Sequence, residues 1–265
     1  MWHLLKIEWL KLKNYRTFWI LSALYLISIF GINYIVYRIQ ENIYNAKEAK
    51  GMAEMMIGTR PYSFPIVWQM TSYVSSFLLF LPGLLLIISI TNEFSYKTHR
   101  QNIIDGWSRK DFISVKLVLA AIIAFVSTLM VFSTALAFGL SSPGSFDTDK
   151  IYFLGYFFIQ TLSYSMVALL FSILFKRGAL AIGVFFLYSV VLENLIAKPL
   201  SHYFDGAGRF FPLEVTDTLI PLPVFENMQR QISTEPNYTL LLIVAIIYLA
   251  LFAFLAVRKF ERDDL

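Results

Sequence analysis

Residues 92–112, NEFSYKTHRQNIIDGWSRKDF, carry side chains of the types that perform nucleophilic and acid–base chemistry. The segment contains His99, two serines and two aspartates, which are the components of hydrolase triads. The other histidines, His3 and His202, lie on distant segments, and the chain has no cysteine to bind a metal or attack a substrate. No H-E-x-x-H, G-x-S-x-G or G-x-x-x-x-G-K-[ST] pattern occurs. We therefore expect no catalytic residue, no metal site and no cofactor or nucleotide site in this chain.

Helix start and stop signals account for the polar residues of this segment better than a catalytic role does. Ser95 is predicted to cap a short helix from about Tyr96 to Asp105, which Gly106 would end in the left-handed conformation. Residues 108–111 read S-R-K-D, a capping-box signature for the next helix. His99 is expected at the surface. The sequence thus predicts a short, well-defined helix between two longer ones.

The elements around this segment are strongly apolar. The chain is 57% hydrophobic and 15% charged, and five long stretches contain no charged residue. A sixth stretch is free of charge until Glu193. A bilayer core requires about 20 apolar residues of helix, so we predict an all-α integral membrane protein with a single transmembrane domain, 1–265. Its six spans are predicted at about 17–37, 66–92, 115–140, 151–175, 178–197 and 238–257.

The distribution of basic residues predicts the topology. Most of the 22 Lys and Arg residues fall on the short connecting segments that six spans would place on the same side of the membrane as the N-terminus. By the positive-inside rule both termini and residues 92–112 are cytoplasmic. The net charge of +4 is therefore explained by topology and does not indicate a nucleic-acid partner.

Four other features each admit two interpretations. Residues 2–16 are either an interfacial amphipathic helix or a basic flank that orients the first span. Pro82 and Gly83 predict a kink in the second span, either a hinge or an ordinary membrane-helix bend. The apolar, proline-rich segment 198–237 forms short interfacial or re-entrant helices, or a folded outer loop. Glu193 is interpreted as an interfacial residue in preference to a proton relay.

The loop also suits a protein partner, because its basic side chains stand beside Ile103, Ile104 and Trp107. A solvated turn held by lipid phosphates is the alternative. The pattern Glu93-Phe94-x-x-x-Thr98-x-Arg100, then Gly106-x-Ser108-Arg109 and Lys116, resembles the cytoplasmic loop of type-2 ABC transporter permeases. The six-span layout and the basic start are similar to that family as well.

This resemblance implies that the loop holds a coupling helix that inserts into a separate ATPase subunit. ATP and Mg²⁺ would then bind to that partner, present in two copies, and a second permease subunit would complete a homodimer in the bacterial cytoplasmic (inner) membrane. The implied activity is export or extraction of a substrate, with Pro82 and Gly83 as the hinge. The docking residues that the resemblance implies are Glu93, Thr98, Arg100, Gly106, Trp107, Ser108 and Arg109.

Two other functions are compatible with the sequence. A secondary transporter or channel would need no ATPase, but the predicted spans offer little intramembrane charge for ion coupling. A non-transporting scaffold or sensor subunit is the second alternative. An intramembrane enzyme is disfavoured because no nucleophile–base pair is visible.

Overall fold

A computed structural model of the chain describes residues 2–45, 60–204, 206–224 and 236–263. Every regular element within these residues is helical. In chain order the elements are α1 (Trp2–Lys13), α2 (Arg16–Asn45), α4 (Val67–Ser76), α5 (Phe80–Ser95), α6 (Thr98–Ile104), α7 (Arg109–Ser141), α8 (Tyr152–Phe175), α9 (Gly178–Phe186), the π-helical η1 (Leu187–Leu192), α10 (Glu193–Tyr203), the 3-10 helix η2 (Ala207–Phe210), α11 (Glu214–Asp217) and α13 (Tyr238–Arg262).

The length and hydropathy of these helices make the chain a multi-pass membrane protein. Five helices are long and apolar enough to cross a bilayer: α2, α7, α8, the continuous run from α9 to α10, and α13. The pair α4 and α5 supplies a sixth span if the two are counted as one broken helix. The prediction of an all-helical membrane fold is confirmed, and every predicted span coincides with one of these elements.

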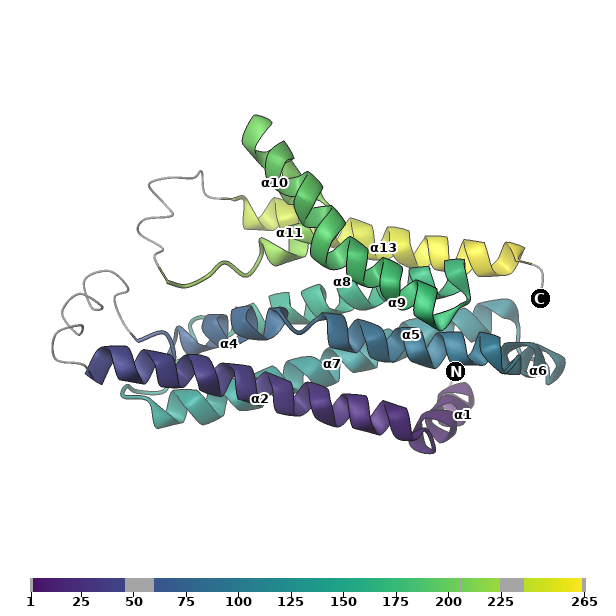
Figure 1. Cartoon of the computed structure of the whole chain (residues 1–265), viewed down its shortest axis with the longest axis horizontal. Coiled ribbons are helices and arrows are strands. Elements are labelled where there is room, and N and C mark those ends of the chain that lie inside the picture. The colour runs from purple at the N-terminus through teal and green to yellow at the C-terminus, as the bar shows by residue number, and fades with distance from the viewer. Residues whose placement is uncertain (1, 46–59, 205, 225–235, 264–265) are drawn as a thin grey trace.

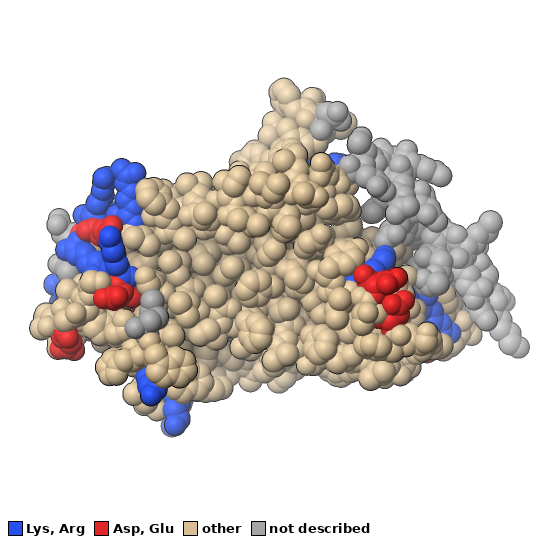
Figure 2. All heavy atoms as spheres, turned by 180° about the vertical axis from the view of Figure 1, so that it is seen from behind, with Lys and Arg blue, Asp and Glu red and all other residues tan. Residues whose placement is uncertain are grey.

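The spanning helices lie side by side along the long axis of the molecule (Figure 1). Both ends of the chain and α6 lie at one end, which we call the proximal end; the opposite end is the distal end. Of the five unbroken spans the most buried is α8, which packs against α4, α5, α7, α9 and α13. Charged side chains gather at the two ends, with an uncharged band between them on the face that Figure 2 shows. This band is the surface that hydrocarbon would cover.

The second span is bent where the sequence predicts a kink. The axes of α4 and α5 meet at 49°, and the break lies at residues 77–79. Pro82 therefore falls in the first turn of α5, where its missing N–H costs little. Gly83 packs against the ring of Phe185 on α9, and an added Cβ would lie 2.4 Å from that ring. Gly83 is thus required for close helix packing at the bend.

The described part of segment 198–237 contains the short helices that the sequence predicts, while residues 225–235 lie outside the described residues. Its helix α11 packs against α8 and α13. The carboxylate of Asp217, at the end of α11, accepts hydrogen bonds from Gln160 Nε2 at 2.8 Å and from Tyr164 Oη at 3.0 Å. Tyr164 lies twelve residues into α8, so α11 reaches about 18 Å along that helix from its distal end.

Glu193 also turns inward at this end, although the sequence places it at the interface. Its side chain is buried, and its Oε1 accepts hydrogen bonds from the backbone N–H groups of Leu213, at 2.5 Å, and Glu214, at 2.9 Å. These are the free donors at the start of α11. A carboxylate at a helix N-terminus is stabilised by those donors, so Glu193 holds α11 in place.

Candidate functional site

The proximal loop between α5 and α7 is a closed, hydrogen-bonded turn around α6. The helix ends with a Schellman motif, in which the N–H groups of Gly106 and Trp107 donate to the carbonyls of Ile103 and Asn102. Gly106 has a φ of 99°, so the predicted left-handed stop is confirmed. The predicted cap at Ser95 is wrong. Ser95 Oγ donates to the carbonyl of Thr91 within α5, and α6 begins two residues later than predicted.

The start of α7 is fixed by the capping box that the sequence predicts. Ser108 Oγ accepts a hydrogen bond from the N–H of Asp111 at 3.0 Å, and the Asp111 carboxylate accepts from the N–H of Ser108 at 3.2 Å. Two donors at the helix start are satisfied in this way. These side chains are therefore used in helix capping, and they form no catalytic pair with His99.

His99 is buried, which contradicts its predicted place at the surface. Its ring packs against Phe94 with ring centroids 4.8 Å apart, and Nδ1 lies 2.9 Å from the backbone carbonyl oxygen of Glu93. Thr98 Oγ1 lies 3.5 Å from the same carbonyl. The last turn of α5 leaves such carbonyls without helical partners, and His99 satisfies this one. His99 thus fastens α6 against the end of α5.

A buried cluster of four charged residues lies behind this loop. Lys116 of α7 is 1% exposed, and its ammonium group contacts the carboxylates of both Glu8 and Glu93. The hydrogen bond to Glu93 Oε1 measures 2.5 Å. Lys11 closes the cluster, with its Nζ 3.3 Å from Glu93 Oε1 and 3.6 Å from Glu8 Oε2. We call Glu8, Lys11, Glu93 and Lys116 the proximal charge cluster.

The proximal charge cluster joins three helices that are far apart in the sequence: α1, α5 and α7. Its two acidic and two basic groups balance in charge, which offsets the desolvation of each of them. Burial alone would raise the pKa of Glu8, but the ammonium groups of Lys116 and Lys11 outweigh burial and hold that pKa below its ordinary value. Glu8 is therefore ionised at neutral pH. Because removal of one partner would leave a buried charge unpaired, the cluster fixes the relative positions of its helices.

The C-terminal end of α13 is attached to the same region. Arg109 Nη1 donates to the carbonyl oxygens of Glu261 at 2.6 Å and Asp263 at 2.8 Å, where a cation is favoured by the helix dipole. The ring of Phe112 stacks on Phe260 of α13 with centroids 4.8 Å apart. The carboxylate of Asp263 also contacts Lys176, with a distance of 2.9 Å. The start of α7 is thus held by α13 as well as by α1.

The outward face of the loop is left free by these contacts. Ile104 is 77% exposed and Tyr96 is 76% exposed, and both are large and apolar. Exposed polar side chains lie between them on α6 and at its ends: Lys97, Arg100, Gln101 and Asp105. We call these six residues the α6 face. Exposed apolar groups beside cationic ones are typical of protein interfaces, so the α6 face can bind a partner while its helix is held from behind.

The residues that the sequence selected for docking divide into two groups. Arg100, Gly106 and Ser108 are exposed, and Thr98 is half-buried. Glu93 and Arg109 instead point to the bundle, in the contacts described above. Trp107 is half-buried, and Lys11 Nζ lies 5.6 Å from the centroid of its ring. The seven residues therefore comprise an outer contact set and an inner anchoring set.

Sequence reasoning missed Glu8 and Lys11 as members of this site. A signal was present in the chain. Glu8 is the one acidic residue among residues 1–16, and it lies a turn of helix from Leu5 and Leu12 on the apolar side of α1. A lone carboxylate at such a position requires a buried basic partner, and Lys116 lies directly before the long uncharged run of α7.

A family model described as "Protein of unknown function (DUF2705)" matches residues 57–265. The chain belongs to the DUF2705 family. The matched region of this DUF2705 chain includes Glu93, the α6 face and Lys116, whereas Glu8 and Lys11 lie before that region. A search of curated proteins finds no match to the DUF2705 chain.

Proposed function

We propose that this chain is the membrane-spanning permease subunit of an ATP-driven exporter of the type-2 ABC class. The observation that carries the proposal is the α6 face, an exposed helix at the proximal end whose inner side is held by the proximal charge cluster. An ATPase docked on this helix would displace three helices together, because Glu93 and Lys116 join α5 and α7 to α1. The sequence pattern over residues 93–116 supports the same assignment.

In this proposal the proximal end faces the cytoplasm of a bacterium, and α1 lies at the interface of the inner membrane. Two copies of an ATPase subunit bind ATP and Mg²⁺, and a second copy of this chain completes the transporter. The short helices η2 and α11 enter the outer leaflet. Nucleotide binding by the ATPase shifts the equilibrium between two arrangements of the spans.

Docking is tested by co-purification of the full chain with the ATPase encoded beside it. The variants Arg100→Glu and Ile104→Asp change one charged and one apolar residue of the α6 face. We expect both to reduce recovery of the ATPase at least tenfold, because central interface residues often contribute more than about 1.4 kcal/mol.

Matched controls lie at the distal end, where Arg38 and Tyr203 are exposed. Arg38→Glu and Tyr203→Asp should leave co-purification unchanged. If the α6 variants bind the ATPase as well as the wild-type chain does, the docking proposal is refuted. If the complex forms and hydrolyses ATP without moving any substrate, the scaffold function replaces export.

A proton-coupled secondary transporter is a second candidate, favoured by one observation. Asp217 carries a buried carboxyl group that contacts Gln160 and Tyr164 inside the bundle, and Glu193 lies buried nearby on α10. Buried carboxyl groups of this kind are used by proton relays. Proton flux in liposomes that contain only this chain, abolished by Asp217→Asn, would establish this alternative.

A further inference from the structure

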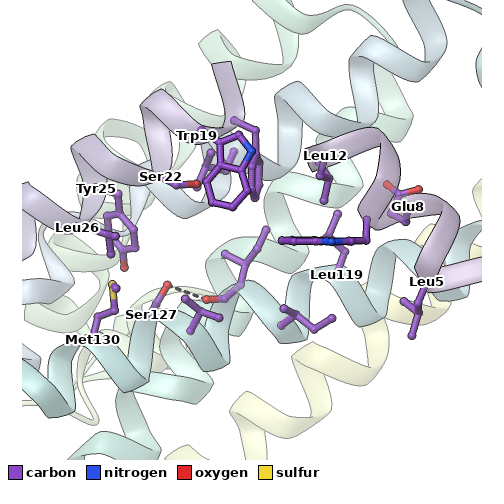
Figure 3. Close-up of a pocket in the computed structure, with 16 residues that line it drawn as sticks. Leu5, Glu8, Leu12, Trp19, Ser22, Tyr25, Leu26, Leu119, Ser127 and Met130 are labelled. Carbon is purple, nitrogen blue, oxygen red and sulfur yellow. Dashed lines mark hydrogen bonds between the residues drawn. The ribbon is translucent and has the colours of Figure 1, made fainter. Parts of the chain in front are cut away.

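A narrow groove runs along the side of the bundle between α1, α2 and α7 (Figure 3). Its volume is about 310 Å³. Trp9 and Trp19 form part of its wall, with their rings edge to face and centroids 6.1 Å apart. The lining is almost entirely apolar, and the hydroxyl groups of Tyr25 and Ser127 lie toward the end that is farther from α1.

The length of the groove matches the depth of one membrane leaflet. Along α7 its lining extends from Leu119 to Met130, which corresponds to about 16 Å at 1.5 Å per residue. Half of a bilayer's hydrocarbon core is about 15 Å. The lining starts on α1, near the proximal end, and ends on α7 at Met130, near the middle of the uncharged part of that helix. An extended hydrocarbon chain of the adjacent leaflet therefore fits its length.

The dimensions argue against a helix from a second copy of the chain as the occupant. A helix segment of the same length, with a diameter of about 10 Å, would occupy roughly 1,200 Å³. That volume exceeds the entire empty space of the groove, which is about 1060 Å³ with its open side included. Single side chains from a neighbour could enter the groove, but a spanning helix could not lie within it.

Basic side chains stand where the headgroup of such a lipid would lie. Lys6 and Lys13 are exposed on α1, and Arg16 is exposed at the start of α2. None of the three makes an ion pair within the described residues. The backbone carbonyl of Lys13 accepts a hydrogen bond from Trp19 Nε1 at 3.0 Å, which places this corner of the chain directly at the groove. Lys, Arg and Trp at the end of an apolar groove are suited to an anionic interface.

We propose that the groove binds one acyl chain of an anionic phospholipid, whose phosphate lies among Lys6, Lys13 and Arg16. The lipid comes from the leaflet at the proximal end. This binding requires neither an ATPase nor transport, so it is independent of the function proposed above. A lipid held here contacts α1, α2 and α7 together and packs beside Glu8 of the proximal charge cluster.

Quenching of tryptophan fluorescence by lipids with brominated acyl chains tests the proposal on the purified full chain. Brominated phosphatidylglycerol is compared with brominated phosphatidylcholine at equal mole fractions in bilayers. The difference between the wild-type chain and Trp19→Phe isolates the signal of the groove. We expect the anionic lipid to bind on the order of 100-fold more tightly, because each of the three basic residues contributes about a fivefold preference.

Two variants separate the groove from general lipid contact. Ser22 is a half-buried lining residue, and Ser22→Phe should fill the groove and abolish the Trp19 signal. Ala23→Phe, at an exposed position that does not line the groove, is its control. Lys6→Gln combined with Lys13→Gln should remove most of the preference for phosphatidylglycerol, whereas Arg258→Gln on α13 should not.

The proposal fails if both lipids quench equally, or if Ser22→Phe and Ala23→Phe quench as the wild-type chain does. It also fails if cysteines placed at Ile122 and Val126 cross-link two copies of the chain while the anionic lipid gives no selective quenching. Because the Lys6 and Lys13 side chains are exposed and make no ion pair within the described residues, their variants keep the test valid even if Ser22→Phe does not fold.

Discussion

Replacement of Lys116 by Met is the sharpest test of the proximal charge cluster. The ammonium group of Lys116 contacts two carboxylates that are 3% and 7% exposed, and methionine removes the charge while keeping most of the side-chain volume. Two carboxylates then share the single cation of Lys11. One buried negative charge is left without a partner, and the folded protein must either tolerate it or bind a proton.

If the folded Lys116→Met protein binds a proton, the free-energy cost can be calculated. The ordinary pKa of a glutamate is 4.5, so holding one protonated at about pH 7.5 costs about 4 kcal/mol at 1.36 kcal/mol per pH unit. This value agrees with the roughly 3–5 kcal/mol typical of a broken buried ion pair. At about 2–4 °C per kcal/mol for a chain of this size, the unfolding midpoint should fall by roughly 8–16 °C.

The pH dependence distinguishes a lost charge pair from lost packing. In Lys116→Met the folded state holds a proton that the unfolded chain releases above about pH 4.5, so stability falls as pH rises. The penalty should therefore shrink by about 1.4 kcal/mol for each unit from pH 7.5 toward 5.5. The contribution of Glu8 in the wild-type chain has the opposite sense. The pKa of Glu8 is lowered in the folded state, so the stability that Glu8 contributes is lost as the pH falls below the ordinary pKa of a glutamate.

Thermal unfolding of the purified chain in detergent, followed by tryptophan fluorescence across this pH range, measures both quantities. Lys110→Met is the matched control, because Lys110 is 74% exposed in its ion pair with Glu261 and should contribute less than about 1 kcal/mol. Glu93→Gln combined with Lys116→Met removes the surplus charge and should restore more than half of the loss. A penalty that is independent of pH, or no larger than that of Lys110→Met, would refute the role assigned to the cluster.

Three further predictions concern other contacts. Burial raises the pKa of Asp217 to about 7, so the stability that its protonated form contributes should be lost as pH rises from about 4 to 7. The unfolding midpoint should decrease over this range, and Asp217→Asn should flatten the decrease. Gly83→Ala places a Cβ 2.4 Å from Phe185 and should cost roughly 1–3 kcal/mol in the same assay, whereas Gly155→Ala, in open space, should cost nothing. Arg109→Gln weakens two bonds to the carbonyls at the end of α13 and should speed amide hydrogen exchange there, with a stability loss of roughly 1.5–3 kcal/mol.

The sequence predicted the spans well because a bilayer imposes a length and a composition that can be counted. Local signals in the loop succeeded for a similar reason. The capping box at Ser108 and the left-handed stop at Gly106 each depend on residues within a few positions of one another. The cap predicted at Ser95 failed because its hydroxyl had a nearer partner, the carbonyl of Thr91 one turn back in α5. Thr and Ser hydroxyls commonly bond to that carbonyl in helices.

The charge cluster could not be derived in the same way, because its members are distant in the chain. Glu8 and Lys116 are separated by 108 positions, and only the packing of α1 against α7 brings them together. His99 was placed at the surface because histidine has no periodic signal on a seven-residue helix. Asp217 was missed because α11 is four residues long, too short to predict from its pattern.

Glu93 has a particular position in the proposed mechanism, because it is attached to the loop and to the bundle through different atoms. Its backbone carbonyl accepts the hydrogen bond from His99 of α6, while its carboxylate binds Lys116 of α7. A displacement of α6 by a docked subunit is therefore passed to α5 and α7 together, with little freedom left in the loop. At its other end α5 meets α4 at the 49° break, where the contact between Gly83 and Phe185 replaces a continuous helix. Since none of the four cluster residues lies on α4, we infer that motion driven from the proximal end changes this angle first.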